Sequence, residues 1–329
     1  MLKLLVSIIC ITFNQESYIA EAIESFLMQK TNFDFEINIG EDCSTDGTRK
    51  IIEEYEMKFP EKIKLITSSH NVGMMHNFFR TLHHSKGKYI AICEGDDYWT
   101  DPYKLQKQVD YMESNTGCSL YVHTAAIIKE KKSTGRFVRP AKYDYIFSIE
   151  DVLRNSGGFF ATPSFLFPKK LLDDLPEFFI HSPVGDYPLT MILAHKGYIF
   201  FKDEPMAAYR TGIRGSWTEN LWAGSHFRQK IIHNIEKDIS ILKGFDLYTN
   251  HKYITLIQDV IDYKKAYQSL MKKEFSILNN YFKDKHVFIK LMLLAYGLFP
   301  KIYKKVRELQ FVEKWRLQLR NRSKTKYEG

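Results

Sequence analysis

Apolar runs alternate with helix-patterned segments along the first 93 residues. Four apolar runs predict strands, at residues 6–14, 35–39, 63–66 and 89–93. Three segments with apolar residues at three- and four-residue spacing predict helices, at residues 16–29, 48–58 and 74–85. Strands that alternate with helices in this way predict a parallel, doubly wound α/β sheet.

Two adjacent carboxylates follow the fourth predicted strand, in the sequence Glu94-Gly95-Asp96-Asp97-Tyr98-Trp99. An open α/β sheet binds its ligands at the carboxyl ends of its strands. Adjacent carboxylates repel each other unless a cation neutralises them, and Mg²⁺ or Mn²⁺ prefers such oxygen ligands together with a substrate phosphate. The segment therefore predicts a divalent-metal site; the alternative is a solvated acidic turn.

Five motifs, taken in order, resemble those of the family-2 inverting glycosyltransferases. They are ITFNQE, EDCSTDGT, HNVG with a following Asn, GKYIAICEGDDYW and GDYPL. Each motif alone is weakly specific, whereas the ordered set is specific. The resemblance covers residues 4–217 and implies the GT-A fold, a Rossmann-like, doubly wound mixed sheet, in a domain at residues 1–217.

The resemblance implies a nucleotide-sugar donor, usually a UDP-sugar. Phe13 stands where the family often has a tyrosine that stacks on the base. Asp42 matches the carboxylate that accepts the uracil N3–H, which cytosine lacks; its alternative role is an Asx turn or a helix cap. The nucleotide-binding residues expected from the resemblance are Thr12, Phe13, Asn14, Glu16, Asp42, Asn71, Gly73, Asn77 and Asp96.

The resemblance also implies the metal ligands and the catalytic base. Asp97 is expected to coordinate Mn²⁺ or Mg²⁺ directly, and Asp96 to contact ribose or a metal-bound water. Asp186, in GDYPL, is expected to take the proton of an acceptor hydroxyl that attacks the anomeric carbon with inversion; its alternative role is a helix cap. The residues expected at the sugar or acceptor pocket, with packing as their alternative, are Glu94, Tyr98, Trp99, Thr162 and Ser164.

One segment departs from the family's pattern. Residues 209–217 read YRTGIRGSW, with Gly212 where relatives often carry a histidine that can ligate the metal. We expect Arg210 and Arg214 to contact the donor diphosphate instead, because a guanidinium pairs well with phosphate.

Composition and charge bear on the size of the core, the cellular compartment and the possible partners. The 329 residues, 44% of them hydrophobic, suffice for a sizeable core and a second module. The four cysteines lack disulfide or zinc spacing, and no signal peptide precedes the first strand, so we expect a cytoplasmic protein. Residues 285–329 hold twelve Lys/Arg and three Asp/Glu, a net charge of +9, against +8 for the whole chain. The remainder is therefore near −1, which argues against nucleic acid as a partner.

Residues 218–329 predict a helical, basic extension. Residues 287–299 are almost wholly apolar, but too short and too interrupted by Lys290 to span a bilayer, and the basic amphipathic residues 301–307 follow. Apolar-then-basic helices lie in the membrane interface and bind anionic lipid. We expect peripheral binding to the inner face of the cell membrane; the alternative, which can coexist, is a homo-oligomer interface.

These features together predict a metal-dependent inverting glycosyltransferase. It would move a sugar from a nucleotide-sugar to a hydroxyl of a glycan or lipid-linked glycan in bacterial surface-polysaccharide synthesis (capsule, O-antigen or lipopolysaccharide). A nucleotidyltransferase would carry a glycine-rich, basic loop after the first strand, where this chain has TFNQE at residues 12–16. A catalytically inactive scaffold subunit is favoured only by Gly212 and opposed by the four intact aspartates.

Overall fold

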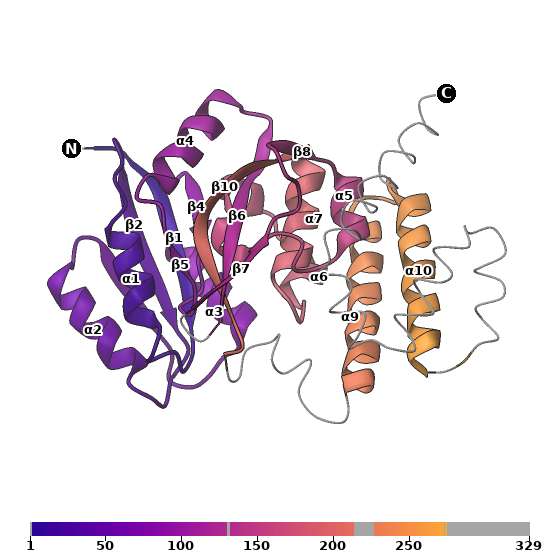
Figure 1. Ribbon diagram of the computed structural model, residues 1–329, viewed down its shortest axis with the longest axis horizontal. Coiled ribbons are helices and arrows are strands. Elements are labelled where there is room, and N and C mark those ends of the chain that lie inside the picture. Colours follow the sequence, from indigo (N-terminus) through magenta and orange to yellow (C-terminus); the bar gives the residue numbers. More distant parts are fainter. Residues whose placement is uncertain (1, 130–131, 214–226, 273, 275–329) are drawn as a thin grey trace. The chain divides into compact units, whose positions relative to one another are not determined.

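The computed structural model describes residues 2–129, 132–213, 227–272 and 274 (Figure 1). The strands are β1 (Leu4–Thr12), β2 (Asp34–Glu41), β3 (Ile63–Thr67), β4 (Tyr89–Ile92), β5 (Tyr98–Trp99), β6 (Cys118–Lys129), β7 (Lys132–Val138), β8 (Tyr145–Phe147), β9 (Leu166–Pro168) and β10 (Tyr198–Thr211). The α-helices are α1 (Ile19–Leu27), α2 (Thr48–Lys58), α3 (Met74–His84), α4 (Lys104–Ser114), α5 (Ile149–Asn155), α6 (Glu177–Ile180), α7 (Asp186–Lys196), α9 (Phe227–Tyr248) and α10 (Ile254–Lys272). Two short 3₁₀ helices are η1 (Thr162–Ser164) and η2 (Lys169–Leu172).

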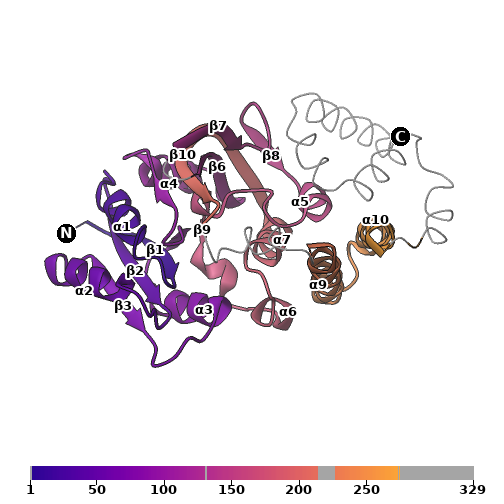
Figure 2. The same cartoon turned by 60° about the horizontal axis from the view of Figure 1, so that its bottom comes forward.

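One mixed sheet organises the α/β part of the chain. Its order is β3-β2-β1-β4-β9-β6-β10-β5, with β7 paired to β6 and β8 to β10. Strands β3, β2, β1 and β4 are parallel, and β9 lies antiparallel between β4 and β6. Helices α1 and α3 lie on opposite faces of the parallel half (Figure 2). The predicted doubly wound, mixed α/β sheet is confirmed.

The core of the sheet follows from the apolar runs of the sequence. Ile8, Ile37 and Ala91, on three neighbouring strands, are fully buried. The register pairs Thr12 with Glu41 and Ile9 with Ile92, so the carboxyl ends of β1, β2 and β4 meet at one edge. This packing places the polar exits of the strands next to one another.

The chain forms two compact units, Met1–Trp222 with Ser240–Ile257, and Ala223–Ile239 with Gln258–Gly329. The domain boundary predicted at residues 217–218 lies in 214–226, outside the described residues. The apolar segment 287–299 and the basic segment 301–307 of the predicted extension also lie outside the described residues. None of the helices that the structure describes has the length and apolarity needed to cross a membrane.

Candidate active site

Three loops lie side by side at the carboxyl edge of the sheet. The backbone N–H of Asp42 donates to the carbonyl of Thr12 at 3.0 Å, and the N–H of Gly95 donates to the carbonyl of Ile11 at 3.1 Å. The carboxyl end of β1 is thus joined to the segments after β2 and β4. These loops carry most of the predicted site residues.

Asp42 is a buried carboxylate whose oxygens are both occupied by backbone donors. It is 3% exposed and accepts hydrogen bonds from the N–H groups of Val72 at 2.8 Å and Gly73 at 2.9 Å. Gly73 has φ +86°, a left-handed conformation that favours glycine. A carboxylate offers about four lone-pair directions, so Asp42 can still accept a base N–H. Its contact with uracil stays a prediction.

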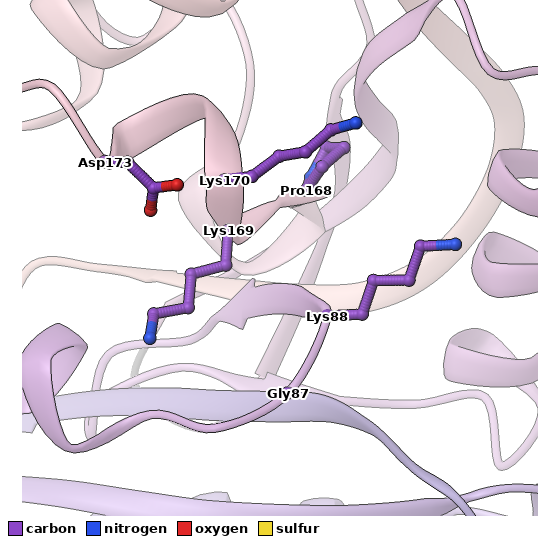
Figure 3. Close-up of a pocket in the computed structure, with 6 residues that line it drawn as sticks. All are labelled: Gly87, Lys88, Pro168, Lys169, Lys170 and Asp173. Atoms are coloured by element: carbon purple, nitrogen blue, oxygen red, sulfur yellow. The ribbon is translucent and has the colours of Figure 1, made fainter.

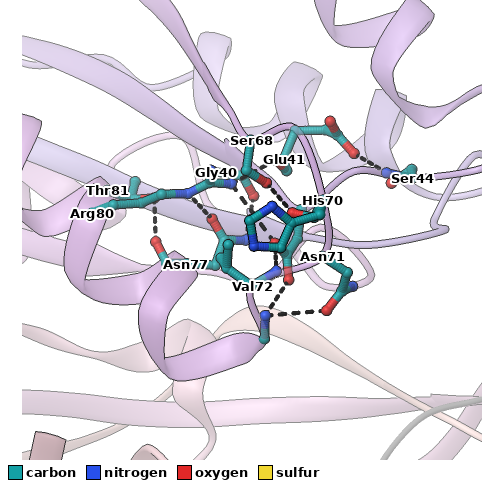
Figure 4. A network of polar contacts seen from close by, with 12 residues as sticks. Gly40, Glu41, Ser44, Ser68, His70, Asn71, Val72, Asn77, Arg80 and Thr81 are labelled. Atoms are coloured by element: carbon teal, nitrogen blue, oxygen red, sulfur yellow. Dashed lines mark hydrogen bonds and ion pairs between the residues drawn. The ribbon is translucent and has the colours of Figure 1, made fainter.

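A polar network surrounds the carboxyl end of β2, and Figure 4 labels its members Arg80, Asn77 and Asn71. Arg80 donates from Nη2 to the carbonyl of Glu41 at 2.6 Å and from Nε to Asn77 Oδ1 at 2.9 Å, and it lies 4.0 Å from the Asp42 carboxylate. Asn77, which is 2% exposed, donates to the carbonyl of Gly40 at 2.7 Å. Asn77 therefore holds Arg80 and the β2 end, and Asn71 accepts from the N–H of Gly73 at 3.1 Å.

The loop after β1 presents Phe13 and ties itself to the loop after β2. Phe13 is 44% exposed, as a stacking platform requires. Asn14, at φ +53°, donates its N–H to Ser44 Oγ at 2.9 Å and accepts from the N–H of Thr45 at 2.8 Å. Glu16 accepts from the N–H of Gly47 at 3.0 Å. Asn14 and Glu16 thus shape the site by joining the two loops.

Thr12 lies beneath this loop and links it to the acidic segment. It is 3% exposed, and its hydroxyl donates to Gln15 Oε1 at 2.7 Å. The Gln15 side chain in turn lies near Asp96 and lowers the pKa of its carboxyl against the effect of burial. The sequence analysis did not single out Gln15, although it lies within the ITFNQE motif.

Three carboxyl groups crowd the loop after β4. Burial, followed by repulsion from Asp96 and Glu94, raises the pKa of Asp97 well above its ordinary value. Burial and the charges of Asp96 and Asp186 raise the pKa of Glu94 to about 8. Burial also raises the pKa of Asp96, against the opposing effects of Arg210 and Gln15. Such crowding disfavours the ionised forms until a cation shares the space.

The carboxylates of Asp96 and Asp97 fit a hard divalent cation whose remaining ligands come from the substrate and water. Within the described residues, no three or more His, Cys, Asp and Glu side chains are grouped so as to enclose a metal ion. Asp96 and Asp97 offer carboxylate oxygens, and Mg²⁺ and Mn²⁺ commonly complete such sites with substrate phosphate and water. Gly212 has φ +77°, a left-handed backbone conformation that favours glycine over a histidine.

Arg210 is turned toward the protein. Its guanidinium donates from Nη1 to the Asp96 carbonyl at 2.5 Å and from Nη2 to Glu21. Its Cζ lies 5.1 Å from the ring centroid of Tyr18 and 4.5 Å from that of Tyr98. The predicted diphosphate contact is therefore not the role that this arrangement favours. Arg214 lies outside the described residues.

Asp186 is the first residue of α7, and its side chain accepts a hydrogen bond from the segment between α5 and η1. Gly158, at φ +72°, donates its N–H to Asp186 Oδ2 at 2.7 Å. The N-cap of α7 is Gly185, so the alternative of an Asp186 cap is not what the structure shows. Its charge helps to raise the pKa of Glu94, after the larger effects of burial and of Asp96, so Asp186 acts on the first carboxyl group of the loop after β4.

The residues predicted at the sugar pocket divide into two groups. Thr162 lies near Glu94, where its hydroxyl opposes the rise in the pKa of that carboxyl. Trp99 is 1% exposed and donates from Nε1 to the carbonyl of Pro163 at 2.9 Å. Ser164 is fully buried, and its hydroxyl donates to the carbonyl of Ala161 at 2.6 Å. Trp99 and Ser164 therefore take the packing alternative, whereas Tyr98 lies against Arg210.

A separate hollow lies at the other end of the strands, where β4 begins and β9 ends. It is lined by Gly87, Lys88, Pro168, Lys169, Lys170 and Asp173 (Figure 3). Lys88 Nζ pairs with Glu113 at 2.7 Å, and Lys169 Nζ donates to the carbonyl of Ser85 at 2.6 Å. The amino group of Lys169 points away from those of Lys88 and Lys170, so the three do not converge on one anion.

Comparison with known proteins identifies the family. Residues 7–175, just over half of the chain, match the family described as glycosyl transferase family 2. The chain therefore belongs to this family. Its fold is the GT-A fold that the sequence predicts.

Two relatives show how far the similarity reaches. An uncharacterised protein of Mycobacterium tuberculosis is 36% identical over 212 residues, covering 64% of this chain and 60% of the relative. The UDP-Glc:alpha-D-GlcNAc-diphosphoundecaprenol beta-1,3-glucosyltransferase WfgD of Escherichia coli is 32% identical over 153 residues, covering 46% of this chain and 56% of WfgD. The chain thus matches about 60% of the length of these curated relatives.

Two solved structures share the fold at low sequence identity. Staphylococcus aureus TarS 1-349, in complex with UDP-GlcNAc, superposes with a TM-score of 0.57 at 15% identity, covering 89% of this chain and 91% of that chain. The mannosyltransferase PcManGT of Pyrobaculum calidifontis, in complex with GDP-Man and Mn²⁺, superposes with a TM-score of 0.57 at 16% identity, covering 94% and 84%.

Proposed function

We propose that this chain is a metal-dependent inverting glycosyltransferase that uses a UDP-sugar. The observation that carries the proposal is one arrangement: the Asp186 carboxylate, held by the Gly158 N–H, acts on Glu94, and Glu94 shares the crowded loop after β4 with Asp96 and Asp97. A single inverting displacement needs a base that accepts the proton of the acceptor hydroxyl. It also needs an acidic loop that can bind a divalent cation. The TarS complex with UDP-GlcNAc supports a uridine donor.

The chemistry follows from where each side chain lies. Phe13 would stack on the base while Asp42 accepts the base N–H. Asp186 would accept the proton of the acceptor hydroxyl as its oxygen bonds to the anomeric carbon and the bond to the diphosphate oxygen breaks. Asp96 and Asp97 would hold Mn²⁺ or Mg²⁺, which when bound neutralises charge on the departing nucleotide.

Asp186→Asn tests the base. The amide keeps the size of the side chain but cannot accept the proton, so we expect transfer to fall by roughly 10²- to 10⁴-fold. UDP binding, measured by thermal shift, should stay unchanged. Asp174→Asn, an exposed aspartate outside the site, is the control and should retain full transfer. If Asp186→Asn transfers sugar at the rate of this control, the base assignment is wrong.

A nucleotide panel tests the donor and the metal. We expect UDP to raise the melting temperature with Mn²⁺ or Mg²⁺ but not with chelator, and Asp97→Ala to lose this effect. Stabilisation by GDP and not by UDP would overturn the uridine assignment, since the fold also occurs with GDP-Man in PcManGT. Detectable sugar transfer or donor hydrolysis would separate an enzyme from a scaffold subunit.

We further propose a glycan or lipid-linked glycan acceptor in surface-polysaccharide synthesis, with the enzyme on the inner face of the cell membrane. The name of WfgD describes a diphosphoundecaprenol-linked acceptor. The +9 net charge of residues 285–329 supports attraction to anionic lipid. An acceptor held in the membrane gives the enzyme a reason to bind there.

A further inference from the structure

An ion pair lies directly behind the acidic loop. Arg210, on β10, is 6% exposed and pairs with Glu21, on α1, whose side chain is 51% exposed. The pair joins two elements that are almost 190 residues apart in the chain. Neither residue belongs to the acidic loop itself.

Arg210 holds this loop by two separate contacts. Its backbone N–H donates to Asp97 Oδ1 at 2.7 Å, and its guanidinium donates to the Asp96 carbonyl. The faces of Tyr18 and Tyr98 flank the guanidinium, which leaves its charge little room to move. The position of the Arg210 charge relative to the two aspartates is therefore fixed.

A fixed cation at this place has two opposing effects. It stabilises the crowded carboxylates before any metal binds, and it repels an incoming divalent ion. Glu21 offsets part of the Arg210 charge without touching either aspartate. The balance between loop order and metal attraction consequently depends on Glu21.

We propose that Glu21 tunes the divalent-cation affinity of the Asp96–Asp97 loop by neutralising Arg210. In this role Glu21 is a positioning residue that acts through Arg210. The inference rests on the proposed metal role of Asp96 and Asp97. It adds a determinant of metal affinity that lies on α1.

Glu21→Gln provides the test, because the amide oxygen can still accept from Arg210 while the charge is lost. Binding of Mn²⁺ alone, and of Mn²⁺ with UDP, is followed by the loss of the free-ion electron paramagnetic resonance signal. We expect the Mn²⁺ dissociation constant to rise by about five- to tenfold. Glu21→Asp, which retains the charge, should stay close to wild type.

Glu24→Gln is the matched control. Glu24 lies on the same helix and undergoes the same change of charge, but it accepts from the Tyr55 hydroxyl at 2.7 Å. We expect it to change Mn²⁺ binding less than about twofold. Melting temperatures in chelator establish that all three variants fold.

The outcomes are distinguishable. If wild type binds Mn²⁺ and Glu21→Gln matches Glu24→Gln, the tuning role is overturned and the metal role of the aspartates survives. If wild type takes up no Mn²⁺ with or without UDP, the metal assignment itself fails, and the inference fails with it. If Glu21→Gln alone binds Mn²⁺ more weakly, the result supports both the tuning role of Glu21 and the metal role of Asp96 and Asp97.

Discussion

Lys104 is a fully buried lysine below the acidic loop. Its Nζ donates to Gln108 Oε1 at 2.8 Å and lies 4.0 Å from the Trp99 ring centroid. Burial lowers its pKa from 10.5 to about 7. The unfolded chain keeps this proton up to about pH 10.5, so between pH 7 and 10.5 the unfolded state binds more protons and stability rises with pH.

We predict that Lys104→Met removes this rise. Wild type should gain up to roughly 4 kcal/mol of unfolding free energy from this group between pH 7 and 10, and the variant should not. Urea unfolding at several pH values measures the difference. Lys107→Met is the control, since Asp101 and Glu204 raise the pKa of Lys107 against the effect of burial. Parallel curves for Lys104→Met and wild type would mean that Lys104 stays charged in the fold.

Single residues show how far the sequence alone could lead. The motifs identified Asp42, Asp97 and Asp186, because these carboxylates occur at recognisable strand and helix ends. They did not reveal that Arg210 pairs with Glu21, since no spacing connects residues so distant in the chain. Burial likewise decided that Ser164 packs, and burial depends on tertiary neighbours that one sequence does not specify.

The connection between α5 and η1 is the element that holds the proposed base. Gly158, at φ +72°, aims its N–H at Asp186, and Gly135, at φ +69° in β7, shares the backbone conformation outside the site. An alanine Cβ at either position would meet open space. The positive φ is nevertheless strained for alanine, which lowers the free energy of unfolding by about 1–2 kcal/mol.

We predict that Gly158→Ala and Gly135→Ala lose similar stability, whereas only Gly158→Ala slows transfer. A shift of the 158 amide should misplace the Asp186 carboxylate and lower kcat by roughly tenfold, with the donor KM little changed. Urea unfolding and steady-state kinetics give the two readouts. Equal kcat for the two variants would argue that this amide does not position the base.

The sequence predicted most helices and strands of the first half of the chain, whereas the short strands of the second half were harder to predict. Helix α2 begins and ends where its spacing predicted, and α3 ends one residue earlier. Helix α1 begins at Ile19 and not near Glu16, because the carbonyl of Gln15 accepts from Tyr18 and Ile19 in a turn. The antiparallel β9 has three residues, too few for a periodic signal, and its place between β4 and β6 depends on distant pairing.

At the scale of the whole molecule, charge is divided unevenly along the chain. Residues 285–329 carry +9, and the remainder is close to −1. In the sequence, the apolar segment 287–299 precedes the basic segment 301–307, an order typical of interfacial helices. Such a segment binds through two contributions, burial of apolar side chains and attraction between basic residues and anionic lipid. The two respond differently to salt, which screens only the attraction.

We predict that deleting residues 286–329 moves the protein from the vesicle pellet to the supernatant when anionic vesicles are sedimented. Each Lys or Arg near an anionic surface contributes about 1 kcal/mol, so the loss should exceed roughly a hundredfold in partition coefficient. An unchanged thermal shift with UDP and Mn²⁺ shows that the shortened chain still folds. High salt should release the full-length protein only in part, because the apolar contribution persists. If both forms partition alike, the membrane role is wrong, and a dimer that dissociates on truncation would favour an oligomer interface instead.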